Sequence, residues 1–221
     1  MNEIFHSLQG EGTRAGTRCI FIRLTSCNLR CAYCDTPYAF DEGDWMTLDQ
    51  IIERVRTFEC PTVEVTGGEP LLQPNVYPLM QRLLDEFATV LLETSGAASI
   101  AKVDPRVVRI VDFKCPSSGE GEKNNWTNVD ALTEHDEVKF VIGDRADYEW
   151  ARRVIRKYDL TLRCPVLLSP VTAPPPADGA ESSVTSLPPD RLAEWLLADR
   201  LDVRLGLQLH KIIWSPTKRG V

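Results

Sequence analysis

The feature that most constrains the fold is a repeated alternation of short apolar segments with amphipathic helical segments. Segments rich in β-branched residues predict strands at 19–25, 62–66, 89–94, 107–111, 137–142, 164–169 and 203–210. Helical patterns cover 47–58, 75–87, 145–157 and 189–199, and one short or irregular helix is expected after Ser95. Such alternation predicts an α/β fold whose mostly parallel sheet is joined by right-handed crossovers.

The predicted strands carry polar residues near their carboxyl ends. In the segment 19–25, Arg23 shares a face with Phe21, whereas Ile20 and Ile22 share the other face, because successive side chains alternate. By the same parity, these pairs of neighbours share a face: Glu64 with Thr66, Leu91 with Glu93, Glu137 with Lys139, and Gln208 with His210. Two interpretations fit this pattern: an open sheet with one solvated face, or a barrel with a polar site inside its carboxyl end.

Size and charge favour one ordinary globular domain spanning 1–221. The chain has 221 residues and a net charge of −7, which argues against a large nucleic-acid footprint. Neither a membrane-spanning run nor a secretory signal pattern is present, so we expect a cytoplasmic protein. The Pro-rich stretch 169–189 is interpreted as an internal surface loop and not as a domain boundary, because the segments after it are needed to complete the sheet.

Three of the seven cysteines, Cys27, Cys31 and Cys34, fall within eight residues. A zinc site usually takes four ligands, often as two separated pairs, and the other cysteines are scattered singly. A disulfide is disfavoured in a reducing compartment. A four-iron cluster normally takes four thiolates, so three would leave one iron open to another ligand.

The spacing C-x3-C-x2-C, with Tyr33 before its last cysteine, resembles the cluster loop of radical S-adenosylmethionine (SAM) enzymes. TGGEP at 66–70, directly after a predicted strand, resembles the GGE motif of that superfamily. The resemblance implies a [4Fe–4S] cluster whose open iron binds SAM, and reductive cleavage of SAM to a 5′-deoxyadenosyl radical.

Further motifs narrow the resemblance to one family. FHSLQGEGTRAG at 5–16, the cluster segment, VTGGEPLLQ and the closing QLHK together resemble the 7-carboxy-7-deazaguanine synthases. The resemblance implies conversion of 6-carboxy-5,6,7,8-tetrahydropterin to 7-carboxy-7-deazaguanine and ammonia, in queuosine and 7-deazapurine biosynthesis, with Mg²⁺ and regenerated SAM. It also implies a reduced, partial TIM-like barrel of about six parallel strands.

The resemblance also implies roles for individual residues. The cluster would be bound by Cys27, Cys31 and Cys34, and Mg²⁺ by Thr36. The substrate would contact Leu8, Gln9, Gly10, Glu11, Arg23, Thr66, His210 and Pro216. SAM would contact Tyr33, Cys34, Asp35, Gly68, Glu69, Ser95, Asp112, Phe113, Lys114 and Ser169.

The family match further implies a homodimer and a flavodoxin or ferredoxin as reductant. Two alternatives remain at this stage. Another small radical SAM enzyme, such as an activase that installs a glycyl radical, would share the cluster and GGE motifs but would not need LQGEG, Arg23 and QLHK together. A non-catalytic iron–sulfur carrier would need four ligands and a far smaller chain.

Overall fold

The computed structural model describes residues 1–173, 184–215 and 218–221. Its strands are β1 (Glu3–Leu8), β2 (Arg18–Leu24), β3 (Thr62–Gly67), β4 (Thr89–Thr94), β5 (Val108–Asp112), β6 (Glu137–Ile142), β7 (Val166–Pro170) and β8 (Arg204–Leu205). Its α-helices are α1 (Leu48–Arg56), α2 (Val76–Glu86), α3 (Asn128–Ala131), α4 (Arg145–Lys157), α5 (Pro189–Asp199) and α6 (Leu209–Ile213).

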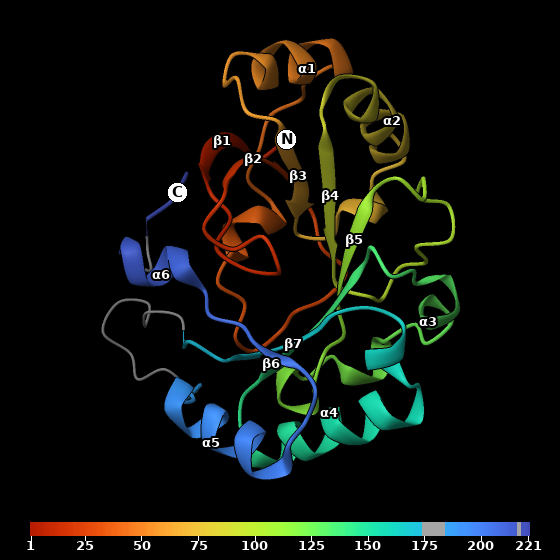
Figure 1. Ribbon diagram of the computed structural model, residues 1–221. Coiled ribbons are helices and arrows are strands. Elements are labelled where there is room, and N and C mark those ends of the chain that lie inside the picture. The colour runs from red at the N-terminus through yellow and green to blue at the C-terminus, as the bar shows by residue number, and fades with distance from the viewer. Residues whose placement is uncertain (174–183, 216–217) are drawn as a thin grey trace.

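The strands form one curved sheet in the order of the sequence, from β1 to β8. β1 runs antiparallel to β2, and every later neighbour pair is parallel. The helices cover the outer face of the sheet (Figure 1). The sheet is open: among the described residues, no strand ladder joins β1 to β8. The prediction of a mostly parallel, partial α/β barrel is therefore confirmed, with an antiparallel strand added at its first edge.

Side-chain parity separates the two faces of the sheet. The outer face packs against the helices and carries the main apolar core, which includes Ile20, Ile22, Val63, Val65, Leu92, Val138, Phe140 and Leu168. The inner face has a small apolar floor of Leu91, Val108 and Ile110. Above that floor, towards the carboxyl ends of the strands, the inner face becomes polar. The structure therefore has a polar interior at the carboxyl ends of its strands, and not a sheet with one solvated face.

Local sequence signals explain several of the elements. Helix α1 begins with a capping box, in which the Thr47 hydroxyl accepts from the Gln50 amide and the Gln50 side chain accepts from the Thr47 amide. Its apolar face, with Ile51, Ile52 and Val55, is buried against the sheet. Among the described residues, no helix is both long and apolar enough to cross a membrane.

Two predicted elements were wrong. The segment 203–210 forms only the two-residue β8, after which the chain coils into α6. Its alternating leucines predict a strand, but tertiary contacts prevail, because Gln208 and Lys211 turn towards partners on the opposite edge of the sheet. No helix follows Ser95 within 95–107, since Asn128 satisfies the backbone there by bonding Gly96, Ala98 and Ile100.

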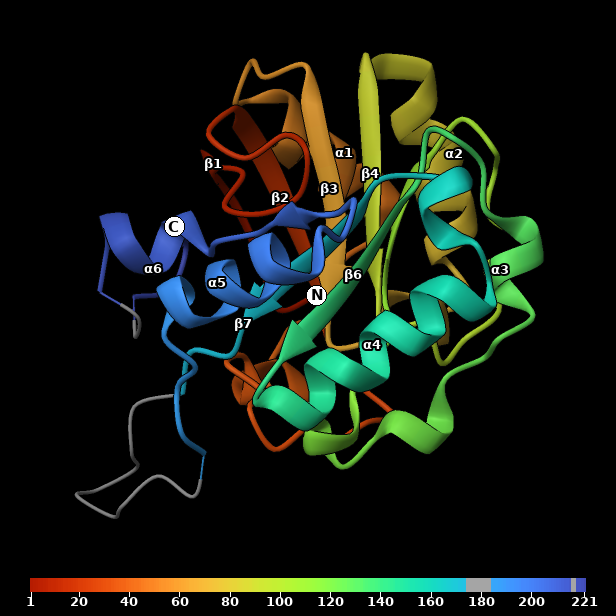
Figure 2. The ribbon, with the colours of Figure 1, turned by 60° about the horizontal axis from the view of Figure 1, so that its bottom comes forward.

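The lateral gap between β1 and the carboxyl-terminal part of the chain is closed where the turn at 9–17 meets the segment that leads into α6. The turn at 9–17 connects β1 to β2, and its Gly10 carbonyl accepts a backbone hydrogen bond from Leu209 at 2.9 Å. At the floor, Thr13 donates from its amide (3.0 Å) and from its hydroxyl (2.5 Å) to Glu137 on β6. In Figure 2, as in Figure 1, α6 lies beside β1.

Candidate functional site

A cavity of about 440 Å³ occupies the polar inner face at the carboxyl ends of the strands. It brings together most of the residues that the sequence predicts for the site. Those that line it are Leu8, Gln9, Gly10, Glu11, Arg23, Cys27, Cys31, Tyr33, Cys34, Asp35, Thr36, Thr66, Gly68, Ser95, Asp112, Lys114 and His210.

The loop that carries the three thiols is fixed by backbone contacts. Ser26, with a left-handed φ of 82°, turns the chain out of β2, and its amide donates to the Ala39 carbonyl at 2.7 Å. Farther along, the Ala32 amide donates to the Ser118 carbonyl at 3.0 Å, and the Arg30 amide donates to Glu120 at 2.9 Å. The loop is therefore attached at both ends to neighbouring loops.

The donor set fits an iron–sulfur cluster. All three thiols are free, half-buried and open to the same cavity. Among the described residues, no three His, Cys, Asp or Glu side chains are already gathered around one point for a metal ion. Thiolates are the ligands that such clusters take, and three of them match a cluster with one exchangeable iron. Beside them, the Thr36 hydroxyl lies 3.9 Å from the Cys34 sulfur and also faces the cavity.

The turn after β3 approaches the cluster loop so closely that only glycine fits. A Cβ on Gly68 would lie 2.2 Å from the Ser26 carbonyl oxygen and 2.8 Å from the Cys27 Cβ. The preceding Gly67 has a φ of 156°, which is open to glycine and rarely to other residues. The GGE motif thus allows the backbone of this turn to lie directly against the cluster loop.

The Glu69 side chain does not line the cavity. It is fully buried, and its carboxylate accepts from the Thr94 hydroxyl, the Ser95 amide and hydroxyl, and the Leu71 amide. A buried carboxylate needs such donors to offset its desolvation. Glu69 therefore joins the turn after β3 to the end of β4. It supports the wall of the cavity without lining it.

Phe113 and Ser169 are also placed differently from the prediction. The Phe113 ring is buried in the outer core, where it stacks on Trp126 with centroids 4.9 Å apart. Ser169 is 3% exposed and faces Gly206 of the neighbouring segment, where a Cβ would lie 2.5 Å from its hydroxyl oxygen. Neither side chain lines the cavity, since strand parity turns Phe113 outward and close packing covers Ser169. Pro216 lies outside the described residues.

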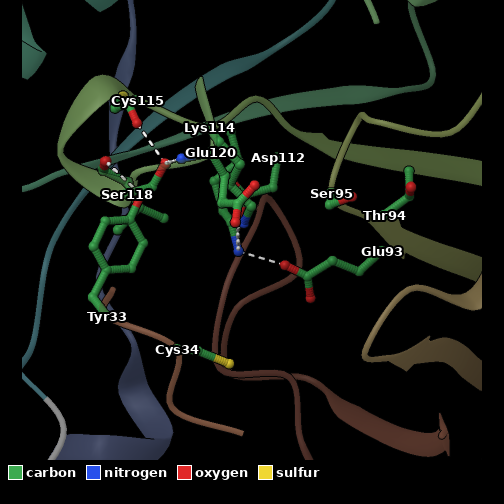
Figure 3. Close-up of polar contacts among 12 residues, drawn as sticks. Tyr33, Cys34, Glu93, Thr94, Ser95, Asp112, Lys114, Cys115, Ser118 and Glu120 are labelled. Atoms are coloured by element: carbon green, nitrogen blue, oxygen red, sulfur yellow. Dashed lines mark hydrogen bonds and ion pairs between the residues drawn. The ribbon is translucent and has the colours of Figure 1, made fainter. Parts of the chain in front are cut away.

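The wall formed by the end of β5 combines a buried carboxylate with an ammonium. Lys114 Nζ lies 2.8 Å from Asp112 Oδ2, and both line the cavity (Figure 3). Burial opposes the charge on Lys114, but Asp112 and its neighbours raise the pKa of that lysine. The second oxygen of Asp112, Oδ1, is buried without a hydrogen-bond partner. A polar cofactor such as SAM, whose amino group and ribose hydroxyls are donors, fits a wall with such an acceptor.

The turn that follows β1 supplies polar groups to the opposite end of the cavity. The Gln9 side chain donates to Glu64 on β3 and accepts from the Glu11 amide at 3.1 Å. The two Glu11 oxygens accept from Lys139 Nζ at 2.8 Å and from Gln208 Nε2 at 2.9 Å. Burial would raise the pKa of Glu11, but Lys139 and Gln208 hold it at about 2, so Glu11 is an ionised acceptor at neutral pH.

Arg23 and His210 face the cavity from the two edges of the sheet. Arg23 Nε lies 2.8 Å from Glu3 Oε1, which also accepts from the Tyr38 hydroxyl at 3.1 Å. This pair orients a planar guanidinium that can bind a carboxylate. His210 packs on Gly10, where a Cβ would lie 2.2 Å from the imidazole Nδ1, and burial lowers the pKa of His210, so the ring is neutral at pH 7. The prediction that His210 lies on a last strand is wrong, because it lies in α6.

Several cavity residues were not assigned a role from the sequence. Glu64, Glu93, Lys139 and Gln208 line the cavity, and strand parity had placed each of them on a polar face. Lys211 also lines it, with Nζ 2.7 Å from Asp35 Oδ2 and 2.7 Å from the Gln208 side-chain oxygen. In the sequence, Lys211 is only a lysine next to His210. Its place in the site becomes clear only from the structure, in which α6 lies beside β1.

Comparison with known proteins gives a consistent result. The family model described as "Radical SAM superfamily" matches residues 21–159. A 7-carboxy-7-deazaguanine synthase from Koribacter versatilis is 49% identical, with 100% of this chain and 99% of the relative covered. One from Chlorobaculum tepidum is 46% identical, with 100% and 96% covered.

Solved structures agree on the fold. The crystal structure of QueE from Escherichia coli superposes with a TM-score of 0.72 at 24% identity, covering 95% of this chain and 93% of that one. Streptococcus suis SuiB bound to S-adenosylmethionine superposes with a TM-score of 0.58 at 10% identity, covering 85% and 49%.

Proposed function

Because the chain belongs to the 7-carboxy-7-deazaguanine synthase family of the radical SAM superfamily, we propose roles for its cavity residues in that reaction. The protein is a radical SAM lyase of 7-carboxy-7-deazaguanine synthesis. The family implies a [4Fe–4S] cluster and SAM. The proposed substrate is 6-carboxy-5,6,7,8-tetrahydropterin, and the proposed second product is ammonia.

One observation carries the assignment of the substrate. A single cavity contains the three thiols, the Gln9–Glu11 turn and the Arg23 guanidinium. A carboxylated pterin needs an acceptor for its ring N–H groups and a cation for its carboxylate, and Glu11 and Arg23 are of these two kinds. The turn follows β1 and the arginine lies on β2, so the ring and the carboxylate would each be bound at the first edge of the sheet.

The cluster and SAM are assigned to the opposite part of the cavity. Cys27, Cys31 and Cys34 would hold the cluster, which supplies the electron that cleaves SAM to the radical. The backbone at Gly68, the Ser95 hydroxyl and the Asp112–Lys114 wall would orient SAM, with Tyr33 and Asp35 beside the cluster. The residues that line the cavity would exclude bulk water from the radical.

Mg²⁺ is assigned to Thr36. The hydroxyl faces the cavity next to Cys34 and between the positions proposed for SAM and for the substrate carboxylate. Mg²⁺ prefers oxygen ligands and keeps several waters, so one protein hydroxyl together with a substrate carboxylate is a suitable set.

The remaining proposals concern the protein as a whole. Much of the Pro-rich stretch 169–189, at 174–183, lies outside the described residues; the segments after it return to the same sheet, since β8 pairs with β7 and α5 packs on it. This supports one domain over 1–221. The resemblance to the family supports a homodimer, a flavodoxin or ferredoxin as reductant, and a cytoplasmic location.

An anaerobic assay tests the function. Reconstituted protein with SAM and dithionite should convert carboxytetrahydropterin to 7-carboxy-7-deazaguanine and ammonia, with many turnovers for each SAM consumed. SAM cleavage without any turnover of the pterin would instead indicate another radical SAM enzyme, such as an activase. Absence of SAM cleavage in a protein that carries its cluster would indicate an iron–sulfur carrier.

A further inference from the structure

The ammonium group of Lys139 on β6 lies among three carboxylates from separate parts of the chain. It is 2.8 Å from Glu11 Oε2 and 3.4 Å from Asp112 Oδ2, and it forms a third ion pair with Glu93 Oε1. Its side chain is 6% exposed. Figure 3 shows the carboxylates of Glu93 and Asp112 pointing towards the same region. All four residues line the cavity.

The electrostatics of this group are strongly coupled. Burial opposes the charge on Lys139, but Glu11, Glu93 and Asp112 raise its pKa well above the ordinary value, so it is a cation at every working pH. Burial is also the main influence on Glu93, and it raises the pKa of that carboxyl although Lys139 opposes the change. In contrast to Glu93, Glu11 has Gln208 as a second donor and stays ionised.

A purely structural ion pair in the same protein looks different. Arg109 and Asp136 are 4% and 1% exposed, bond each other through two guanidinium nitrogens, and do not line the cavity at the strand ends. That pair joins β5 to the loop before β6, away from the cavity. Lys139, in contrast, places its charge against the residues that face the substrate position.

We propose that Lys139 is a positioning residue for ring recognition, which holds Glu11 as an ionised acceptor and fixes Glu93 beside it for the N–H donors of the substrate ring. This inference rests on the function proposed above, and it assigns a role to a residue that acts through its neighbours. Donors on a pterin-like ring need charged, fixed acceptors, and a buried carboxylate without a cation would take up a proton instead.

The inference has a pH signature. Glu11 is faced by Lys139 from β6, by Glu64 and Glu93 from β3 and β4, and by Gln208 and His210 from the carboxyl-terminal segment. With a pKa of about 2, Glu11 is ionised throughout pH 5.5–8.5, so it gives wild-type affinity no pH dependence there. Without Lys139, burial dominates and the pKa of Glu11 rises. Ring binding should then be weakest at low pH and should recover as the pH rises.

The test uses the reconstituted holoenzyme, with SAM bound and no reductant, and measures the Kd of carboxytetrahydropterin from pH 5.5 to 8.5. Lys139→Met should weaken pterin binding roughly 10- to 100-fold at pH 7, and the loss relative to the wild type should be larger at low pH than at high pH. SAM affinity should change by less than about threefold, because Lys114 still pairs with Asp112. Lys139→Arg, which restores the charge, should recover the wild-type pH profile. Exposed Lys102→Met is the matched control.

The outcomes separate the inference from the function on which it rests. If the wild-type enzyme does not bind or convert the pterin, the function fails and so does the inference. If the wild type converts it and Lys139→Met binds it with wild-type affinity, or with a loss that is equal at every pH, the inference alone is overturned. Should Lys139→Met not fold, Lys139→Gln, which is neutral but polar, takes its place under the same criteria.

Discussion

The two walls of the cavity are built in different ways. The cluster wall consists of residues 26–36, 66–70 and 112–120, and backbone hydrogen bonds from Ala32 to Ser118 and from Glu69 to Ser26 join these loops. The ring wall consists of residues 9–11, 208–211, Glu64 and Lys139. Besides the backbone hydrogen bond from Leu209 to Gly10, side-chain contacts hold the ring wall, and they join residues 128 and 197 positions apart in the sequence. The cluster wall therefore depends on local motifs, whereas the ring wall depends on charges brought together by the fold.

The largest effect expected is on the cluster wall. Cys31→Ala removes one of three thiol ligands, and no other described cysteine lines the cavity apart from Cys27 and Cys34. The variant should lose the brown chromophore and all SAM cleavage, because two thiolates cannot hold a four-iron cluster. Anaerobic absorption spectra and a 5′-deoxyadenosine assay measure both. Cys164→Ala, at a buried site away from the cavity, is the control and should keep the chromophore.

A smaller loss of turnover should follow from a change at Glu69, the buried residue that supports the cluster wall. Glu69→Gln replaces a buried carboxylate that accepts from Thr94, Ser95 and Leu71 with an amide that brings its own donors. We expect a loss of about 1–3 kcal/mol in unfolding free energy. Turnover should fall roughly 100-fold, because misplacement of the turn by about 1 Å has a cost of that order.

Calorimetry and SAM titration check this prediction. Glu86→Gln breaks an exposed ion pair with Arg56 and should change little. A Glu69→Gln protein with wild-type Tm that has lost SAM affinity would indicate direct contact with SAM, and the supporting role would have to be abandoned.

A moderate effect is expected at Thr36, where the two walls meet. Thr36→Val keeps the shape of the side chain but removes the hydroxyl, so turnover should fall roughly tenfold and the response to Mg²⁺ should weaken. SAM affinity should persist. Steady-state rates over a Mg²⁺ titration measure this, with Thr57→Val at the exposed end of α1 as control. Wild-type stimulation by Mg²⁺ in the variant would remove Thr36 from the proposed metal site.

The same contrast explains what the sequence could predict. The cluster loop, the glycines at 67 and 68 and the strand parity of Arg23 are local patterns, and each places its residue in the cavity. The role of Glu69 and the outward turn of Phe113 depend on which donors and rings surround them, and no spacing encodes that. The ion pair of Lys211 with Asp35 requires α6 to lie against the first edge of the sheet. The leucine pattern that predicts a longer strand at 203–210 points away from that arrangement.

The smallest effect should be at Glu64, on the ring wall. Glu64 is 2% exposed and accepts from Gln9. Burial, followed by the nearby Glu93, raises its pKa well above the ordinary value. A neutral carboxyl group at this position can be replaced by an amide of the same shape, which still offers an oxygen to Gln9. Glu64→Gln should therefore retain turnover within about threefold, because the cluster wall and the Lys139 contacts are unchanged.

The pH dependence of the stability that Glu64 contributes distinguishes a buried neutral carboxyl group from a buried carboxylate. Because the folded pKa is raised, the stability that Glu64 contributes is complete below the ordinary carboxyl range and is lost as the pH rises towards the folded value. Glu64→Gln lacks this loss, so its Tm should exceed that of the wild type increasingly from pH 5 to pH 9. Thermal unfolding of both holoenzymes measures the difference, with exposed Glu134→Gln as control. Parallel curves for Glu64→Gln and the wild type would show that Glu64 carries its charge in the folded protein, and the ring wall would then hold one more ionised acceptor.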